Sequence, residues 1–227
     1  MSVEKIQMKI LQPAAVSMLR VELPKPMIDE VNNYIDETVI PENIDHSSNL
    51  VGQINRNKRS SQLKFNFDNS DTSKMFQNTL SSIGTQFLQN AYKRASRAEA
   101  YEGWTIHSYE GDYNPLHSHG VQTTAGLSCI VYLKVPKQIT ELPEPIGGSL
   151  NHASGDTDGM TAFHWGHTSG KDHYELKHPT TAMIKPIEGL MILFPNWLNH
   201  CVNPFFGEGE RRTFSANFNI YDNEGNE

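Results

Sequence analysis

The sequence has few cysteines and no long hydrophobic run. Its 227 residues include only two cysteines, Cys129 and Cys201, which cannot build a disulfide framework. A chain of this length can instead bury a core large enough to be stable without covalent links. Its longest apolar runs, such as LMILF at residues 190–194, fall far short of the roughly 20 residues that span a bilayer. We therefore expect one domain, residues 1–227, that does not enter a membrane.

The sequence also lacks a secretory signal and an excess of positive charge. The N-terminal stretch MSVEKIQMKILQPAAV has no continuous apolar segment behind a basic start, so we expect a cytoplasmic protein. The chain carries 19 Lys+Arg against 26 Asp+Glu, a net charge of −7. Because phosphate contacts need clustered positive charge, we expect no nucleic-acid partner. The basic run NRNKRS at residues 55–60 is either a solvated loop or a patch that docks a substrate.

What the sequence does contain changes in character near residue 100. Residues 25–39 and 73–96 repeat apolar side chains at steps of three and four, which is typical of amphipathic helices. In the second stretch, Phe76, Leu80 and Phe87 belong to one apolar stripe. We expect residues 1–100 to form a helical support region that packs on a sheet.

From residue 101 to 221 the pattern becomes that of short strands separated by Gly, Pro, Asn and Asp. Strands at this spacing favour a sandwich, a jelly roll or a barrel. We interpret the polar stretch 136–180 as excursions from that barrel. The expected strands are residues 101–110, 127–135, 160–166, 181–186, 189–195 and 211–221.

Two histidines in the segment NPLHSHG, His117 and His119, have the spacing of a metal site. Side chains at i and i+2 of a strand project from the same face roughly 7 Å apart, so both can reach one ion. A third ligand must come from elsewhere in the barrel, and His200 follows the strand that ends at residues 195–197. By itself, a histidine pair of this kind is more often a surface pair than a ligand pair.

The last predicted strand alternates in polarity, so that one of its faces is polar and the other mainly apolar. The polar face is explained equally by exposure to solvent and by the wall of an anion pocket, in which an arginine grips a carboxylate. A slip of one residue would exchange Arg211 and Arg212 between the faces. The polar face carries Arg211, Thr213, Ser215, Asn217 and Asn219, and the other face carries Arg212, Phe214, Ala216, Phe218 and Ile220.

Taken in order, these pieces resemble the Fe(II)/2-oxoglutarate-dependent oxygenases, and within them the prolyl-hydroxylase-like branch that includes small phage and bacterial hydroxylases. The resemblance covers roughly residues 101–221, as W-x-I, N-P-L-H-x-H, S-C-I-V-Y-L, G-L-M-I-L-F-P-x-W-L-x-H and R-x-T-x-S-x-N. It implies a mainly β (α+β) fold, a double-stranded β-helix of the jelly-roll or cupin-like type, buttressed by the N-terminal helices.

The resemblance also implies the site. His117, His119 and His200 would bind Fe(II), while Arg211 with Thr213, and Tyr132, would hold the distal carboxylate of 2-oxoglutarate. The expected reaction hydroxylates a substrate with O2 and releases succinate and CO2, and ascorbate would support it. His119 stands where this family usually has a carboxylate ligand. The nearby carboxylates Glu110 and Asp112 have less suitable spacing.

The sequence is also compatible with two other functions. A three-histidine cupin-like dioxygenase would need no oxo acid and no Arg211, and a non-enzymatic β-sandwich could use the histidines for a structural metal. The substrate is a small molecule or a peptide, with a peptidyl proline as one candidate. We expect it to enter at a mouth edged by residues 136–180 and 47–62. Trp104 and Trp197 are interpreted as packing residues, and the histidines of residues 152–178 as loop residues.

Overall fold

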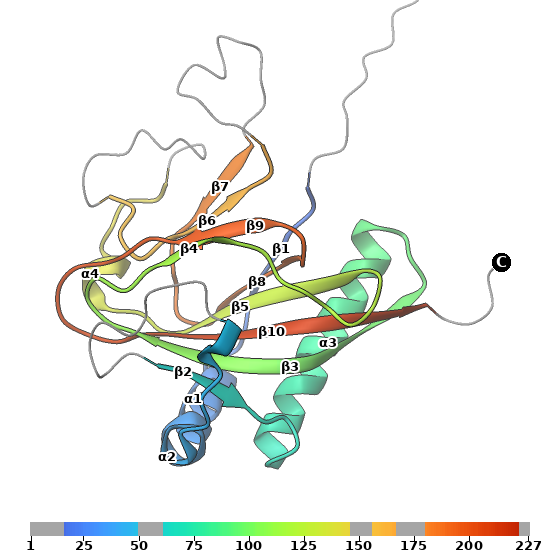
Figure 1. Cartoon of the computed structure of the whole chain (residues 1–227), viewed down its shortest axis with the longest axis horizontal. Helices are drawn as coiled ribbons and strands as arrows, with labels where there is room; N and C mark the ends of the chain where they lie inside the picture. Colours follow the sequence, from blue (N-terminus) through green and yellow to red (C-terminus); the bar gives the residue numbers. More distant parts are fainter. Residues whose placement is uncertain (1–15, 50–60, 146–155, 167–179, 223–227) are drawn as a thin grey trace, which may run out of the picture.

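Two antiparallel sheets face each other in this protein, with helices beneath the larger one (Figure 1). The computed structural model describes residues 16–49, 61–145, 156–166 and 180–222. Across these ranges the mainly β fold expected from the sequence is confirmed. Residues of the basic run 55–60, and most of the expected excursions within 136–180, lie outside the described part of the chain.

The larger sheet has six strands and contains β10 near its centre. β10 pairs with β5 on one side and with β3 on the other. The sheet order is β1 (Leu19–Glu22), β8 (Leu190–Pro195), β5 (Gly126–Lys134), β10 (Arg211–Asp222), β3 (Ser96–Ser108) and β2 (Ser61–Phe65). Both edge strands, β1 and β2, come from the first hundred residues. That region is therefore more than the helical support predicted from its sequence.

The smaller sheet has four strands and lies over the larger one (Figure 1). Its order is β4 (Asn114–His117), β9 (Asn199–Val202), β6 (Thr161–His164) and β7 (Thr181–Ile184). Strands β6 and β7 were expected from the sequence, whereas β4 and β9 were not. These two unexpected strands pair with each other, and His117 of β4 lies opposite His200 of β9.

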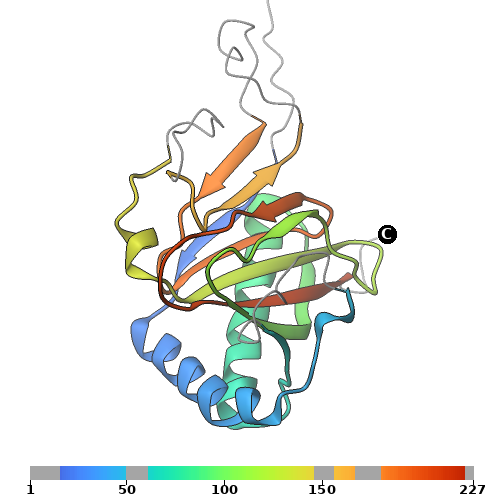
Figure 2. The ribbon, with the colours of Figure 1, turned by 60° about the vertical axis from the view of Figure 1, so that its left-hand side comes forward.

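The two longest helices lie against the face of the larger sheet that points away from the smaller one (Figure 2). The first predicted helix is confirmed as α1 (Lys25–Tyr34), which continues as the π-helix η1 (Ile35–Val39) and the short α2 (Ile40–Glu42). Two further short helices are η2 (Ser47–Asn49) and α4 (Lys137–Thr140). None of the described helices combines the length and apolar character that crossing a membrane requires.

The long helix α3 (Asp71–Ala91) begins with a capping box formed by Ser70 and Ser73. It ends five residues before the predicted end at residue 96. Lys93 adopts a left-handed backbone conformation with φ of 54°, and the N–H of Arg94 donates to the carbonyl of Leu88. This backbone turn terminates the helix, and β3 starts at Ser96.

Helix α3 also closes the edge of β3 beyond the point where β2 ends. Ser81 and Thr85 accept hydrogen bonds from the backbone N–H groups of Ala100 and Ala98, and Gln77 donates to the carbonyl of Ala100. The approach is close enough that a Cβ on Gly84 would lie 3.0 Å from the Cβ of Ala98. Side chains of the helix thus take the place of a neighbouring strand.

The main hydrophobic core lies between the helices and the larger sheet. Phe214 of β10 is fully buried there, with its ring centre 4.9 Å from those of Phe65 and Phe76. The apolar face predicted for the last strand is therefore the core face. Its opposite face, which carries Arg211, points into the space between the two sheets.

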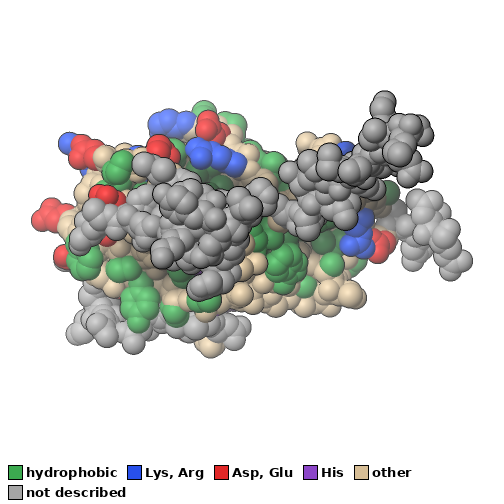
Figure 3. Space-filling model, turned by 90° about the horizontal axis from the view of Figure 1, so that it is seen from above, with side chains coloured by type: hydrophobic (Ala, Val, Ile, Leu, Met, Phe, Trp, Pro, Cys, Tyr) green, Lys and Arg blue, Asp and Glu red, His purple; other side chains and the backbone are tan. Residues whose placement is uncertain are grey.

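Only part of the space between the sheets is apolar. A second cluster around Tyr132, Phe163 and Phe194 fills one portion of it, and a polar cavity occupies another. Figure 3 shows the molecule from the side of the smaller sheet. On the described part of that face, basic and acidic side chains lie side by side, with hydrophobic side chains between them.

Candidate functional site

The polar cavity has a volume of about 270 Å³ and lies between the two sheets. Its floor is the polar face of β10, since Arg211, Thr213, Ser215 and Asn217 all line it. The alternation seen in the sequence therefore belongs to an enclosed wall and not to a solvent-exposed face. The neighbouring strand β3 extends this floor with alternate residues, Glu102, Trp104, Ile106 and Ser108.

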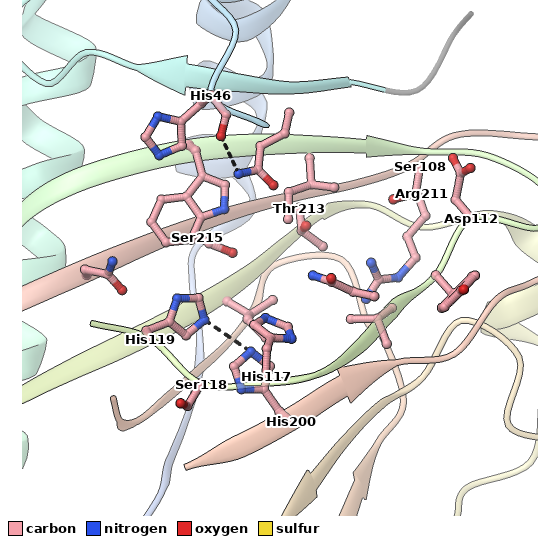
Figure 4. A pocket seen from close by; sticks show the side chains of 18 of the residues that line it. His46, Ser108, Asp112, His117, Ser118, His119, His200, Arg211, Thr213 and Ser215 are labelled. Carbon is pink, nitrogen blue, oxygen red and sulfur yellow. Dashed lines mark hydrogen bonds between the residues drawn. The ribbon is translucent and has the colours of Figure 1, made fainter. Parts of the chain in front are cut away.

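Three histidines meet at one side of this cavity (Figure 4). His117 ends β4, His200 lies opposite it in β9, and His119 follows β4 in a loop. Asn196 fixes that loop: its side-chain amide donates to the carbonyl of His119, and its own carbonyl accepts from the N–H of His119. One ring nitrogen of each histidine lies within 4.8 Å of the other two. The structure thus brings together the three histidines selected from the sequence.

Backbone carbonyls orient two of the three imidazoles. Nδ1 of His117 lies 2.7 Å from the carbonyl oxygen of Pro115, and Nδ1 of His200 lies 3.1 Å from that of Leu198. Because a carbonyl can only accept, both Nδ1 atoms carry the proton, which leaves a lone pair on each Nε2. Metal-binding histidines are commonly held in this way. Nε2 of His119 lies 3.2 Å from Nε2 of His200, so in the absence of a metal the His119 ring donates to the unprotonated nitrogen of His200.

Burial keeps these histidines neutral at physiological pH. Loss of hydration lowers the pKa of His117, and burial together with the neighbouring His117 lowers the pKa of His119 to about 4. The same effects lower the pKa of His200 to about 3. Neutral imidazole is the form that binds a metal ion. The cluster therefore has the donor atoms and the protonation state of a metal site.

No carboxylate belongs to this cluster among the described residues. Asp112 lines the cavity but lies toward Arg211 and Ser108 in Figure 4, and its Oδ2 accepts from the backbone N–H of Tyr109. Glu110 is not among the residues that line the cavity. Neither carboxylate considered from the sequence takes the place of His119. The residues that are present fit a divalent cation held by three neutral imidazoles.

Arg211 is a buried cation without a counter-ion among the described residues. Its exposed fraction is 3%, and its Nε has no hydrogen-bond partner. Nη2 makes a long contact of 3.4 Å with Oγ1 of Thr161, and burial lowers the pKa of Arg211. An unpaired buried charge is costly, whereas a carboxylate bound at this position would compensate it. The environment of Arg211 therefore fits an anionic ligand.

The adjacent arginine has the opposite environment. Arg212 is equally buried but points to the other side of the sheet, where it donates to Glu210, Asp36 and Asn32 at 2.8, 2.6 and 3.1 Å. Carboxylates of the fold itself balance its charge. Arg211, and not Arg212, therefore faces the cavity.

Tyr132 and Thr213 lie next to each other on β5 and β10. Thr213 lines the cavity, whereas Tyr132, on the same face of the sheet, is fully buried and is absent from the lining. The hydroxyl of Tyr132 donates to Oγ1 of Thr161 at 2.8 Å, and the guanidinium carbon of Arg211 lies 5.3 Å from the Tyr132 ring centre. Tyr132 therefore touches the surroundings of Arg211, and Thr161 connects the two side chains.

Several residues of the cavity were not selected from the sequence. His46 and Gln62 enter it from either side of the segment 50–60, and Asn114 has a buried Oδ1 without a partner. Trp104, expected only to pack, lies between His46 and His119, with ring centres 5.5 and 5.6 Å away. The sequence could have predicted Glu102 beside Trp104, because it stands two residues earlier and so shares the same face of the strand. The path of a loop, which brings in His46, leaves no such signal in the sequence.

Other residues noted in the sequence lie away from the cavity. The ring of His164 contacts Thr181, and its Nε2 lies 3.7 Å from Sγ of Cys201. Trp197 is 58% exposed and is absent from the cavity lining. His152, His167, His173 and His178 lie outside the described residues.

Comparison with solved structures gives matches across nearly the whole chain at low identity. A prolyl-4-hydroxylase from Pseudomonas putida is 9% identical over 92% of this chain and 94% of that chain, with a TM-score of 0.56. A prolyl hydroxylase from Trichoplax adhaerens, in complex with a hypoxia inducible factor peptide fragment, is 13% identical over 90% and 83%, with a TM-score of 0.56. HygX from Streptomyces hygroscopicus, with nickel and 2-oxoglutarate bound, is 10% identical over 92% and 84%, with a TM-score of 0.53. The expected double-stranded β-helix is confirmed by these similarities.

A search of curated proteins gave no match. The family model of the 2OG-Fe(II) oxygenases, in which 2OG stands for 2-oxoglutarate, matches residues 102–217, just over half of the 227 residues. The match begins at Glu102 and ends at Asn217, so it includes the three histidines and Arg211. This chain belongs to the 2OG-Fe(II) oxygenase family.

Proposed function

We propose that this oxygenase hydroxylates a small-molecule or peptide substrate, with iron held by His117, His119 and His200 and 2-oxoglutarate anchored by Arg211. The observation that carries the proposal is the environment of Arg211. Its buried guanidinium, which has no carboxylate partner among the described residues, lies in the same cavity as three neutral imidazoles whose ring nitrogens lie within 4.8 Å of one another. A cation site and an anion site that share one cavity fit a metal ion and a dicarboxylate together.

O2 is the oxidant, and iron with 2-oxoglutarate, when bound, would activate it: O2, 2-oxoglutarate and a substrate C–H yield CO2, succinate and a C–OH, so the oxo acid and the substrate are both oxidised. The protein supplies binding and orientation. The guanidinium fork of Arg211 is suited to bidentate binding of the distal carboxylate, and the hydroxyl of Thr213 on the same face offers one more donor. Tyr132 acts through Thr161, to which its hydroxyl donates, and so positions the wall beside Arg211.

The histidines are oriented for metal binding before any metal arrives. Hydrogen bonds from Nδ1 to the carbonyls of Pro115 and Leu198 fix the rings of His117 and His200, and Asn196 fixes the loop of His119. A third imidazole in place of a carboxylate leaves one more unit of positive charge on the metal site. We expect this charge to strengthen the binding of the dianionic oxo acid.

The finer identity of the substrate is a separate part of the proposal. Two of the structures similar in fold are prolyl hydroxylases, and one of these contains a bound peptide fragment. We infer that a proline-containing peptide is a suitable first probe, together with small molecules. Ascorbate is expected to sustain turnover by keeping iron reduced.

The three-histidine cluster also favours one competing function, an oxygenase that uses the same metal without an oxo acid. Such an enzyme would leave the buried charge of Arg211 without a role. The alternative of a non-enzymatic metal-binding module is not supported, because the chain belongs to an enzyme family.

The test is a succinate-release assay with purified protein, Fe(II), 2-oxoglutarate and ascorbate under air. We expect succinate above the level of a metal-free control, even without substrate. O2 consumption that needs Fe(II) but is independent of 2-oxoglutarate would favour the competing function. No 2-oxoglutarate binding to the metal-loaded protein in calorimetry would contradict the proposal.

A further inference from the structure

The cavity has a second end, far from Arg211, where a carboxylate stands. Arg211 of β10 lies opposite Ser108 of β3, whereas Asn217 lies opposite Glu102. Six residues of strand separate the two ends, a distance of roughly 20 Å. Arg211 fits the oxo acid at one end. The other end remains for the substrate.

Glu102 is oriented by an amide and an imidazole. Nδ2 of Asn217 donates to Oε2 of Glu102 at 3.0 Å, and Nε2 of His46 lies 3.4 Å from Oε1. The hydrogen bonds with His46 and Asn217 hold the pKa of Glu102 below its ordinary value despite burial. A carboxylate can accept about four hydrogen bonds, so further positions stay open. Neither Lys nor Arg forms an ion pair with Glu102 in the described parts of the chain.

This carboxylate stands close to the histidine cluster. Trp104 follows two residues later on the same face of β3, roughly 7 Å along the strand. The ring of Trp104 in turn lies 5.6 Å from that of His119. A substrate whose charged group contacts Glu102 would therefore have a carbon atom a few bonds from that group beside the histidine cluster. Trp104 adds an aromatic wall along which an alkyl chain can lie.

A second, outer cavity adjoins the same end of the cavity. This outer cavity has a volume of about 430 Å³, and His46 and Glu102 line both cavities. Tyr101, Gln122 and Asp68 are among its other lining residues. A ligand longer than the inner cavity can therefore continue outward past Glu102. The side chain of Glu102 is one-third exposed, at 33%, which makes it accessible from this side.

We propose that Glu102 selects the substrate, and that the substrate carries a protonated amine or a guanidinium on an alkyl chain. The charged group pairs with Glu102, and the hydroxylated carbon lies a few bonds away, next to the histidine cluster. The source of this chemistry is a free basic metabolite or a lysine or arginine side chain of a peptide. This inference rests on the proposed function of the site.

The test measures succinate release by the full-length, iron-loaded enzyme with matched probes. Free lysine, free arginine and spermidine represent small molecules, and the pentapeptide Gly-Gly-Lys-Gly-Gly represents a peptide. The same pentapeptide with norleucine in place of lysine keeps the alkyl chain without the charge. We expect at least one cationic probe to accelerate succinate release above the probe-free rate, and the norleucine peptide to fail. Acceleration by the small molecules alone or by the lysine peptide alone distinguishes the two sources.

Variants assign the effect to Glu102. Glu102→Gln should raise KM for the active probe at least about tenfold, a change of about 1.4 kcal/mol, because a charge-assisted hydrogen bond is lost. Glu102→Asp keeps the charge and should retain KM within about threefold. Glu99→Gln is the matched control, since Glu99 lies on the same strand, pairs with Arg97 and is absent from both cavity linings. Circular dichroism checks that each variant is folded.

The outcomes separate this inference from the proposed function. If the enzyme turns over 2-oxoglutarate but no cationic probe accelerates it, selection by Glu102 is wrong while the oxygenase function stands. Equal changes of KM in Glu102→Gln and Glu99→Gln would also overturn it, because only the overall charge would then matter. If the metal-loaded protein neither binds nor consumes 2-oxoglutarate, both proposals fail together.

Discussion

The two adjacent arginines of β10 should respond in opposite ways to the same substitution. Arg211 is buried without an ion pair among the described residues, so Arg211→Met removes a buried charge and leaves no carboxylate unpaired. The desolvation cost of a buried ion is several kcal/mol. We therefore expect the free energy of unfolding of Arg211→Met, measured without ligand, to be unchanged or higher by about 1–2 kcal/mol.

Arg212→Met should instead destabilise the fold. It breaks hydrogen bonds to Glu210 and Asp36 and leaves Lys134, at 3.9 and 3.2 Å, as the remaining cation beside the two carboxylates. Breaking a buried pair in this way costs about 3–5 kcal/mol. Because Asp36 is 45% exposed and can be solvated, we expect the lower end of that range, about 3 kcal/mol.

The affinity for 2-oxoglutarate should show the reverse order. Arg211→Met removes two charge-assisted hydrogen bonds to the distal carboxylate, each worth about 1.5–3 kcal/mol. A loss of about 3 kcal/mol corresponds to roughly 100-fold weaker binding. Metal content should remain unchanged, because Arg211 does not belong to the histidine cluster.

Two measurements test these opposite effects on stability and affinity. Urea unfolding followed by circular dichroism gives the stability of each metal-free variant, and calorimetry with Zn(II) in place of iron gives the 2-oxoglutarate affinity. Arg212→Met serves as the matched control for affinity, provided that it is folded. The reasoning would be refuted by an Arg211→Met protein that loses about 3 kcal/mol of stability and still binds 2-oxoglutarate as the wild type does.

Three further predictions test the metal site, the charge network and the packing of the fold. His200→Ala should lose most bound metal in elemental analysis, since it removes one of three converging nitrogens, and full metal content would exclude His200 as a ligand. Burial would raise the pKa of Glu210, but hydrogen bonds from His107 and Arg212 outweigh it and hold this pKa at about 2, below its ordinary 4.5. A lowered carboxyl pKa stabilises the fold above about pH 4.5, and this stability, of the order of 3 kcal/mol, is lost as pH falls toward 2. Glu210→Gln should therefore be less stable than the wild type at pH 7, with a flatter dependence on pH below 4.5; an unchanged pH curve would count against it. Gly84→Leu should lower the free energy of unfolding by about 1–3 kcal/mol, because even a Cβ would lie 3.0 Å from that of Ala98. Chemical denaturation measures this change, and a fully stable variant would show that α3 can move away from β3.

The parts of the site that lie on one strand could be predicted from the sequence. Alternation assigned Arg211, Thr213 and Ser215 to one face of β10, and the structure has them on the cavity floor. The spacing of His117 and His119 likewise placed both on one side of a chain segment, although His119 lies in a loop beyond the end of β4. Their roles as ligands remain predictions. The residues that share one face of a strand could therefore be predicted from the sequence alone.

The rest depended on contacts between distant segments. The strands that were not predicted, β1, β2, β4 and β9, have only four or five residues each and did not stand out from their surroundings in the sequence, and β4 contains a proline. Their conformation follows from the strands with which they pair. The end of α3 depends on a left-handed turn at Lys93, a residue type that gives no warning of it. The position of His46 beside Glu102 likewise requires knowledge of how the chain enters β2.

The central position of β10 has a consequence for biosynthesis. β3 and β5 are both made more than 70 residues before β10, yet each uses β10 as its neighbour in the sheet. A nascent chain that has not reached residue 211 therefore exposes two unpaired strand edges. Such edges can associate with other chains. We expect the nascent protein to need a chaperone until β10 emerges, and the cavity floor to form late in folding.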